Sequence, residues 1–363
     1  MIGKITLCLI MVCGVLLMKA QSQDSLIYYN AGNFEIIGKG FSGTEMLYDR
    51  LPGYLKDTLR SALWKLSKNS SGIAVRFCSN TTAIGLKWEA LFLNDMNHMA
   101  ATGVRGLDLY SYEKDHWQYM CTAKPGEKKS QVNLISNMQP VEREYLLYLP
   151  LYDGVVSVEI GIDQGAAIAN PNISQPKKDQ PIVFYGTSIT QGGCASRPGM
   201  AYPSIVERKM NIETINLGFS GNGLMDWEIL EAMLTIDASC YVIDCLPNCD
   251  IQRVNERGYK FISRLLEKKK GIPVVMVGEA GFTQSYFDLT IKNKVDEKNQ
   301  VWKSIYDRLK NEGNNNLYFI PGDQLIGDDY EGTVDGRHFT DLGFQRCAEK
   351  MTEVINPLIK QNK

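Results

Sequence analysis

The sequence predicts an α/β protein of two domains: an all-β sandwich or jelly roll, then a doubly wound domain with a parallel sheet and flanking helices. Three observations support this fold class. The length of 363 residues allows two domains of average size. Apolar and polar residues alternate in many short segments of the first part of the chain. In the second part, short apolar strands alternate with longer helical periods.

The composition is that of an ordinary soluble globular protein. Hydrophobic residues make up 44% of the chain and charged residues 22%, which excludes a disordered chain, a collagen-like repeat and a coiled-coil rod. Lysine and arginine number 39 against 41 acidic residues, so the formal net charge is −2. A charge of this size does not attract a nucleic acid or an anionic membrane, and we expect neither as a partner.

Residues 1–22 have the pattern of a secretory signal peptide. Lys4 supplies the positive charge, Ile5–Met18 is an apolar stretch, and small residues follow at Ala20 and Ser22. A transmembrane helix needs about 20 apolar residues, so the alternative, an uncleaved membrane anchor, is disfavoured. We therefore expect a periplasmic or secreted protein with no stable insertion in a membrane.

Residues 24–175 form the expected β-domain. Period-2 alternation predicts strands, because successive side chains of a strand point to opposite faces. The expected strands are Ile73–Phe77, Ile84–Trp88, Gly106–Tyr112, Trp117–Thr122, Glu142–Leu149 and Val155–Ile162, with one helix at Leu55–Leu66. Short strands at this spacing favour a sandwich or jelly roll.

A polar, proline-rich linker at residues 171–181 is expected to lead into an α/β domain over residues 178–363. Its expected strands are Ile182–Tyr185, Thr214–Leu217, Tyr241–Asp244, Pro273–Val277 and Tyr318–Ile320, and its expected helices are Asp226–Leu234, Val254–Lys268, Val295–Asn311 and Gly343–Ile359. Because a helix occupies each crossover, the strands are expected to be parallel. Ligands of such sheets bind beyond the carboxyl ends of the strands.

One glycine-rich segment resembles a nucleotide-binding motif. Gly38–Gly43 matches G-x-G-x-x-G, but the motif needs a helix directly after it, and Pro52 and Gly53 interrupt the next segment. We expect a glycine-rich turn here.

The cysteines and histidines form no recognisable metal motif in the sequence. Cys240, Cys245 and Cys249 lie close together but lack the paired spacing of a zinc site, so buried thiols or one disulfide are expected. The three histidines are spread along the chain, at His98, His116 and His338.

Ser188 is the first candidate catalytic residue. It comes shortly after the apolar strand Ile182–Tyr185, with Gly186 before it and Gly192 after it. This pattern places the hydroxyl at the carboxyl end of a strand, although it is not the G-x-S-x-G elbow of α/β-hydrolases. A serine in an ordinary strand-to-helix turn is the alternative interpretation.

Asp335 and His338 lie three residues apart, just before the last expected helix. A serine hydroxyl is a poor nucleophile until a base removes its proton, and the base must be oriented by a third group. We expect Asp335 to hold the Nδ1–H of His338, and His338 to present its other nitrogen to Ser188.

Two further residues are candidates for an oxyanion hole. Gly221 lies in the segment Asn216–Gly223 after the second strand, and Asn248 follows the third strand. Acyl transfer needs hydrogen-bond donors aimed at the developing negative charge, and a glycine amide and an asparagine side chain meet that need. Both residue types are also common in turns.

The order Ser188, Gly221, Asn248, His338 is similar to that of the SGNH (GDSL-like) hydrolases. Gly186-Thr187-Ser188 stands in the place of the family's Gly-Asp-Ser, and Asp335 with His338 matches its D-x-x-H. This resemblance covers roughly residues 181–363 and implies a flavodoxin-like hydrolase domain.

The first domain also resembles part of an SGNH subgroup. Gly106-Leu107-Asp108-Leu109-Tyr110 matches the G-x-D-L-Y signature of a β-domain that precedes the hydrolase domain in that subgroup, and Arg50-Leu51-Pro52 fits it too. Nearly the whole mature chain is therefore covered.

The resemblance implies a serine esterase. Ser188 would attack an ester carbonyl with His338 as general base, and the oxyanion would be held by the Ser188 amide, the Gly221 amide and Asn248. No cofactor or metal is needed for this reaction. The implied substrate is a small-molecule or glycan ester, such as an acetylated carbohydrate.

Three positions depart from the family pattern. Thr187 replaces the usual aspartate, and Leu246-Pro247-Asn248-Cys249 replaces Gly-x-Asn-Asp, which alters the loop around Asn248. The segment Gly278–Phe282 fits no rule for a substrate-facing loop.

Two other functions stay open at this point: a lipase or thioesterase for longer acyl chains, and a glycan-binding protein with a vestigial hydrolase half. The β-domain has two possible roles. One role is to shape access to the catalytic mouth, with Asp108–Tyr110 near the cleft, and the other is to present a sugar-stacking platform. The aromatic candidates for the platform are Trp88, Tyr110, Tyr112, Trp117 and Tyr119.

Overall fold

The structure, a computed structural model, describes residues 26–171 and 177–361. The expected signal peptide at residues 1–22 lies outside the described residues. Among those that are described, no helix combines the length and the apolar character needed to cross a bilayer.

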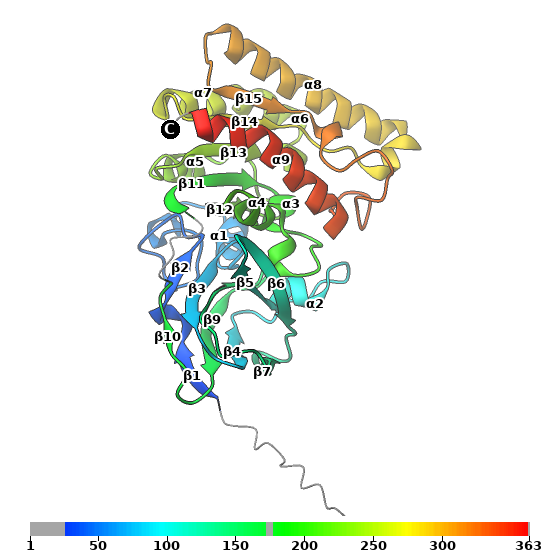
Figure 1. The fold of residues 1–363 in the computed structure, drawn as a ribbon. Helices are drawn as coiled ribbons and strands as arrows, with labels where there is room; N and C mark the ends of the chain where they lie inside the picture. Colours follow the sequence, from blue (N-terminus) through cyan, green and yellow to red (C-terminus); the bar gives the residue numbers. More distant parts are fainter. Residues whose placement is uncertain (1–25, 172–176, 362–363) are drawn as a thin grey trace, which may run out of the picture.

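The first part of the chain forms two antiparallel sheets, in the lower half of Figure 1. One sheet has the order β1-β9-β4-β7, and the other β10-β3-β8-β5-β6, with β2 paired to β3. The strands are β1 (Ile27–Asn30), β2 (Glu35–Ile37), β3 (Ala74–Ser79), β4 (Ile84–Ala90), β5 (Leu107–Glu113), β6 (His116–Ala123), β7 (Lys129–Ile135), β8 (Arg143–Tyr148), β9 (Val155–Ile162) and β10 (Ile168–Ala169). Alternate side chains of both sheets, such as Leu86 and Leu147, form one buried core, as in a β-sandwich.

The second part is the expected α/β domain, built on a five-stranded sheet. The strands are β11 (Lys177–Gly186), β12 (Ile212–Gly218), β13 (Cys240–Asp244), β14 (Val274–Val277) and β15 (Leu317–Ile320). Their order is β12-β11-β13-β14-β15, and every neighbouring pair is parallel. This is the flavodoxin-like order, in which the direction of strand addition reverses between β11 and β13.

Helices cover both faces of this sheet (Figure 1). In the described residues the helices are α1 (Ser61–Ser67), α2 (Ala101–Arg105), α3 (Ser188–Gln191), α4 (Tyr202–Met210), α5 (Trp227–Met233), α6 (Ile251–Arg253), α7 (Tyr259–Lys268), α8 (Leu289–Asn311) and α9 (Asp341–Gln361). Side chains of β11 alternate between two cores: Val183 and Tyr185 pack with α5, α7 and α8, whereas Ile182 and Phe184 pack with α4 and α9. A strand buried on both faces explains the continuous apolar run in the sequence.

The fold class predicted from the sequence is confirmed, but some element boundaries were wrong. The helix expected at Val295–Asn311 already begins at Leu289. The helix expected at Leu55–Leu66 begins only at Ser61, because Arg60 is extended with ψ 137°. Its guanidinium pairs with the carboxylate of Asp226, at 2.9 Å. The linker expected at residues 171–181 ends earlier, since Lys177 already pairs with Ile212 as part of β11.

The first segment of the chain also contributes to the core of the α/β domain. Leu51, Leu55 and Leu63 are buried in the same cluster as Val183 and Phe219. Helix α1 therefore packs against the parallel sheet, although it lies within the β-domain in sequence. This segment thus joins one of the two cores of the α/β domain, whereas the sandwich has a core of its own.

Most of the aromatic side chains proposed for a sugar platform are packed inside the protein. Trp88, Tyr110 and Trp117 are 3%, 2% and 7% exposed, whereas Tyr119 is 42% exposed. Trp88 lies in the sandwich core, and Tyr110 faces the α/β domain, where the guanidinium of Arg208 lies 4.2 Å from its ring centroid. A stacking platform needs exposed ring faces, so these residues do not form one.

The structure supports the simpler interpretation of the cysteines, as buried thiols, and of the segment Gly38–Gly43, as a glycine-rich turn. All seven cysteines in the described residues are free thiols, and Cys121 is the one that is not fully buried. The disulfide alternative is therefore not realised there. Gly38–Gly43 forms a loop after β2, and α1 follows only at Ser61.

Candidate active site

Ser188 lies at the carboxyl end of the interior strand β11, beside the point where strand order reverses. It is the first residue of α3, and Thr187 caps that helix by accepting a hydrogen bond from the Ile189 amide at 3.2 Å. Gly186 is needed for close packing, since a Cβ there would lie 1.9 Å from the Thr190 hydroxyl and 2.6 Å from the Asp244 carbonyl oxygen. The N–H of a first helical residue has no partner inside the helix, so the Ser188 amide stands beside its own hydroxyl as a donor.

His338 and Asp335 lie on the loop that precedes α9. A bridge between Thr333 and the buried Phe339 closes this loop. Nε2 of His338 lies 2.9 Å from Oγ of Ser188, and its Nδ1 lies 2.7 Å from Oδ2 of Asp335. The structure therefore brings together a hydroxyl, an imidazole and a carboxylate that are up to 150 residues apart in sequence.

The surroundings of Asp335 keep it ionised. Partial burial raises the pKa of this carboxyl, but hydrogen bonds from the His338 ring and from the backbone amides of His338 and Arg337 outweigh that effect and lower the pKa to about 2. A carboxylate at neutral pH accepts the Nδ1–H, which fixes the tautomer with a lone pair on Nε2 toward Ser188. The amides of His338 and Arg337 donate to Oδ1 at 2.8 and 3.0 Å and hold the carboxylate in place.

Gly221 and Asn248 come together at the same edge of the sheet. Gly221 has φ +64°, which favours glycine, and no heavy atom lies within 4 Å of the place where its Cβ would be. Asn248 ends the short helix Leu246–Asn248 after β13, and its Nδ2 donates to the Phe219 carbonyl at 3.3 Å. The asparagine thus contacts the loop of Gly221, not its own turn, and one N–H of its amide is left for another acceptor.

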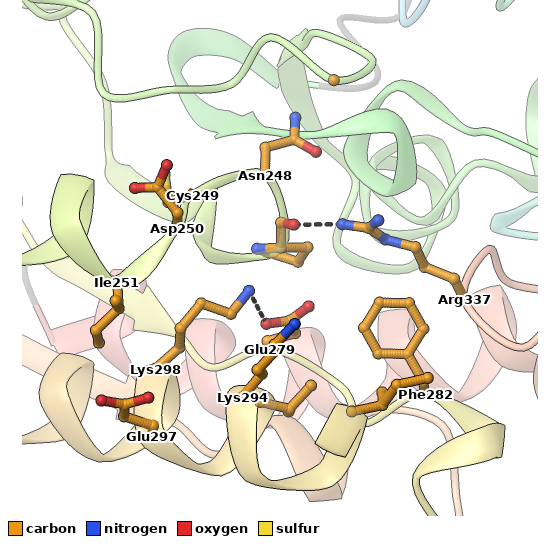
Figure 2. Close-up of a pocket in the computed structure, with 14 residues that line it drawn as sticks. Asn248, Cys249, Asp250, Ile251, Glu279, Phe282, Lys294, Glu297, Lys298 and Arg337 are labelled. Atoms are coloured by element: carbon orange, nitrogen blue, oxygen red, sulfur yellow. Dashed lines mark hydrogen bonds and ion pairs between the residues drawn. The ribbon is translucent and has the colours of Figure 1, made fainter. Parts of the chain in front are cut away.

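A cavity of about 790 Å³ opens beside these two residues. It lies between the loop after β13, the segment after β14 and the first half of α8 (Figure 2). Its walls are formed by Gly221, Pro247, Asn248, Cys249, Asp250, Ile251, Glu279, Phe282, Ile291, Lys294, Val295, Glu297, Lys298 and Arg337. The segment Gly278–Phe282, for which the sequence suggested no role, therefore lines a cavity through Glu279 and Phe282.

Two charged groups of this cavity form a buried ion pair with each other. Figure 2 shows Lys298 reaching Glu279, a carboxylate that is 2% exposed and forms an ion pair with it. Burial raises the pKa of Glu279, and Lys298 partly offsets that shift. Arg337 donates to the Pro247 carbonyl and lies 5.0 Å from the ring centroid of Phe282. The lining therefore combines apolar side chains with several charged ones.

Sequence reasoning did not predict the role of Arg50. This side chain is 2% exposed and donates to the carbonyls of Leu66, Asn69, Asn216 and Gly218. The bonds to Asn216 and Gly218, 3.2 and 2.7 Å long, hold the end of β12, from which the Gly221 loop continues. The Arg-Leu-Pro signature was the signal that could have indicated this.

Residues of the G-x-D-L-Y signature likewise hold the chain on the other side of Ser188. Asp108 is fully buried and accepts hydrogen bonds from Nη1 of Arg197 at 2.8 Å and from the Gly199 amide at 2.9 Å. Tyr110 also bonds to Arg197, at 2.5 Å. The β-domain therefore holds the chain segment that follows Ser188, as expected for a domain that packs beside the cleft.

His98 is a second residue that the sequence did not connect with the site. It lies on the loop between β4 and α2, and its ring centroid is 5.6 Å from that of His338. No local pattern could reveal this proximity, because it depends on how the two domains pack.

Comparisons with known proteins identify the family. The profile of the GDSL-like Lipase/Acylhydrolase family matches residues 179–356, and a profile for the N-terminus of esterases of the SGNH-hydrolase type, GxDLY, matches residues 26–168. A crystal structure described as a GDSL-like lipase from Bacteroides ovatus ATCC 8483 is 34% identical, covering 92% of this chain and 98% of its own, with a TM-score of 0.87. This chain belongs to the GDSL-like lipase/acylhydrolase family. It is therefore a hydrolase of the esterase type.

Other solved structures share the fold of this GDSL-like hydrolase at low identity. A salicylyl-acyltransferase from a tetracycline biosynthetic pathway is 14% identical, with a TM-score of 0.72 over 89% of this chain and 94% of its own. An acetyl xylan esterase from Butyrivibrio proteoclasticus is 11% identical, with a TM-score of 0.53 over 93% of this chain and 99% of its own. No curated protein sequence matches the chain.

Proposed function

We propose that this GDSL-like hydrolase is an exported serine esterase in which Ser188 is the nucleophile, His338 the general base and Asp335 the group that orients the base. The observation that carries the proposal is the continuous hydrogen-bonded chain from Ser188 through His338 to Asp335, with links of 2.9 and 2.7 Å. The apolar stretch Ile5–Met18 supports export.

The proposed reaction has two halves. His338 removes the proton from Ser188 as Oγ attacks the ester carbonyl, and Asp335 stabilises the imidazolium that forms. His338 then gives the proton to the leaving alcohol, so that an acyl-enzyme remains on Ser188. In the second half, His338 activates a water, the acid leaves, and Ser188 regains its proton.

The oxyanion of each tetrahedral intermediate needs its own donors. We assign the backbone amides of Ser188 and Gly221 and the Nδ2 of Asn248 to this role. The contact between Asn248 and the Phe219 carbonyl supports the assignment, because it holds the side-chain amide against the loop of Gly221. Donors fixed before the reaction stabilise the transition state without the cost of reorganisation.

The substrate we propose is an acetylated carbohydrate. The fold is shared with an acetyl xylan esterase, and that likeness concerns the fold alone, so the substrate is a proposal to be tested. A carbohydrate ester also fits export, since such polymers lie outside the cytoplasm.

The cavity favours a second candidate, an esterase for larger acyl groups. About 790 Å³ far exceeds the space that an acetyl group fills, and the walls near Asn248 include Ile251, Ile291 and Val295. A medium-length or aromatic acyl group would bury these apolar surfaces and gain about 25 cal/mol for each Å² removed from water.

The two candidates differ in a simple assay. Initial rates are compared on the acetyl and octanoyl esters of p-nitrophenol, and acetate release is measured on acetylated xylan and pectin. A preference for the acetyl ester supports the deacetylase, whereas a higher kcat/KM on the octanoyl ester overturns it. Ile291→Trp fills the cavity and should lower only the octanoyl rate if the acyl group binds there. Hydrolysis of none of these esters, with glycan binding retained, would support the glycan-binding alternative.

A further inference from the structure

Three metal-ligating side chains meet beside Ser188, although they are far apart in sequence. His98 lies on a loop of the β-domain, Cys194 follows α3, and His338 lies on the loop before α9. One nitrogen of each imidazole and the sulfur of Cys194 all lie within 4.8 Å of one another. Cys194 is 7% exposed, and both histidines are half-buried.

Both imidazoles are held in the way that suits a metal ligand. Nδ1 of His338 lies 2.7 Å from the Asp335 carboxylate, and Nδ1 of His98 lies 2.9 Å from the side-chain oxygen of Asn97. An oxygen acceptor fixes the proton on Nδ1 and leaves a lone pair on Nε2. Histidines that bind metals in proteins are usually oriented by such a hydrogen bond from the second ring nitrogen.

The donor set selects the kind of metal. Two imidazoles and one thiolate suit Zn²⁺, which binds nitrogen at about 2.0–2.1 Å and sulfur at about 2.3 Å in a tetrahedron. In that geometry the ligand atoms lie about 3.3–3.6 Å apart. The present separations of up to 4.8 Å would therefore have to shorten by up to about 1.5 Å when the ion binds.

We propose that His98, Cys194 and His338 form an inhibitory site for a soft divalent metal ion, Zn²⁺ above all. The binding site stands on the geometry of the three side chains, and its inhibitory effect rests on the proposed function of His338. Zn²⁺ occupies the Nε2 lone pair of His338 that would otherwise accept the Ser188 proton. The Cys194 thiol gives its proton to solvent when it binds, and water fills the fourth position of the tetrahedron.

The first experiment measures binding without activity. The full chain, treated with EDTA and dialysed, is titrated with Co²⁺ as a spectroscopic probe and with Zn²⁺ in a calorimeter. We expect one ion per chain and a cobalt–thiolate charge-transfer band. Cys194→Ser should lose the band, and His98→Asn should weaken binding at least tenfold. Ser188→Ala should bind as the parent does, because the serine is not needed as a ligand.

The second experiment measures inhibition. Zn²⁺ should inhibit hydrolysis of p-nitrophenyl acetate, and EDTA should restore it. Cys194→Ser and His98→Asn should hydrolyse the ester in EDTA and need at least tenfold more Zn²⁺ for half-inhibition. Cys121→Ser and His116→Asn, which change residues of β6, should respond like the parent.

The outcomes separate the two proposals. Equal sensitivity of parent, Cys194→Ser and His98→Asn to Zn²⁺ would overturn the metal site and leave the esterase proposal intact. Stoichiometric binding that depends on both residues, in a protein that hydrolyses no ester, would support the site and overturn the proposed function.

Discussion

Replacement of Asn248 by alanine tests the proposed oxyanion hole most directly. If its side-chain amide donates to the oxyanion, the bond is stronger in the transition state than in the ground state. Loss of one such donor costs on the order of 10²–10³ in kcat, or about 3–4 kcal/mol, with little change in KM. The other two donors are backbone amides, which the substitution leaves in place.

The structural cost of the same substitution is much smaller. Asn248 is half-buried and makes a single 3.3 Å hydrogen bond to the Phe219 carbonyl. A bond of this kind contributes about 0.5–1.5 kcal/mol to stability. The predicted loss of kcat therefore exceeds anything that the lost contact explains through unfolding at assay temperature.

Asn316 provides a matched control. It is also half-buried, and its Nδ2 donates to a backbone carbonyl, that of Ile272, at 2.7 Å. It lies at the amino end of β15, on the opposite edge of the sheet from Ser188. Asn316→Ala should lower the Tm about as much as Asn248→Ala and leave kcat unchanged.

The assay is steady-state hydrolysis of p-nitrophenyl acetate by the parent and both variants, with a thermal melt of each. A folded Asn248→Ala protein that keeps more than about a third of the parent's kcat would refute the oxyanion role, since the loss falls far short of a missing donor. Equal losses of kcat in both variants would show that stability, not chemistry, was measured.

Four further substitutions have predictable effects. Ser188→Ala should abolish burst-phase acylation, and Asp335→Asn should lower kcat by about 10⁴ by favouring the wrong tautomer of His338; rapid-mixing kinetics and circular dichroism check both. Arg50→Lys should lower the Tm by several degrees and also lower kcat, because one ammonium group cannot replace a guanidinium that donates to four carbonyls; unchanged kcat would contradict its effect on the Gly221 loop. Burial raises the pKa of Asp244 to about 7, so the folded state holds a proton that the unfolded state has released, and stability should fall as pH rises from about 4 to about 7. The Tm of Asp244→Asn relative to that of the parent should then rise between about pH 4 and about pH 7, and a Tm difference that does not change with pH would disprove the shift.

Local sequence patterns predicted the elements of this protein well. The apolar run of residues 182–185 had to become a strand buried on both faces, and Ser188 directly after β11 had to lie at the carboxyl end of that strand. The same holds for Gly221 after β12 and Asn248 after β13. These statements depend on periodicity and on chain neighbours, which the sequence contains.

Local sequence patterns did not predict the residue at which α1 begins. The apolar positions from Leu55 onward have a helical period, but the chain forms the short 3-10 helix Gly53–Leu55 and a turn before α1 begins. Arg60, the residue before α1, is not helical, and its guanidinium pairs with Asp226 of the other domain, a contact that no local pattern contains.

By itself, the sequence determined the fold class, the order of the candidate catalytic residues and the chemistry that each of them offers. Only the tertiary structure decided which of them touch: the strand order β12-β11-β13-β14-β15 brings His338 to 2.9 Å from Ser188. Only packing between the domains placed Arg50 on the carbonyls of β12 and His98 beside His338. Such contacts join residues more than 100 positions apart, and their energies come from burial and charge pairing across surfaces that no local pattern describes.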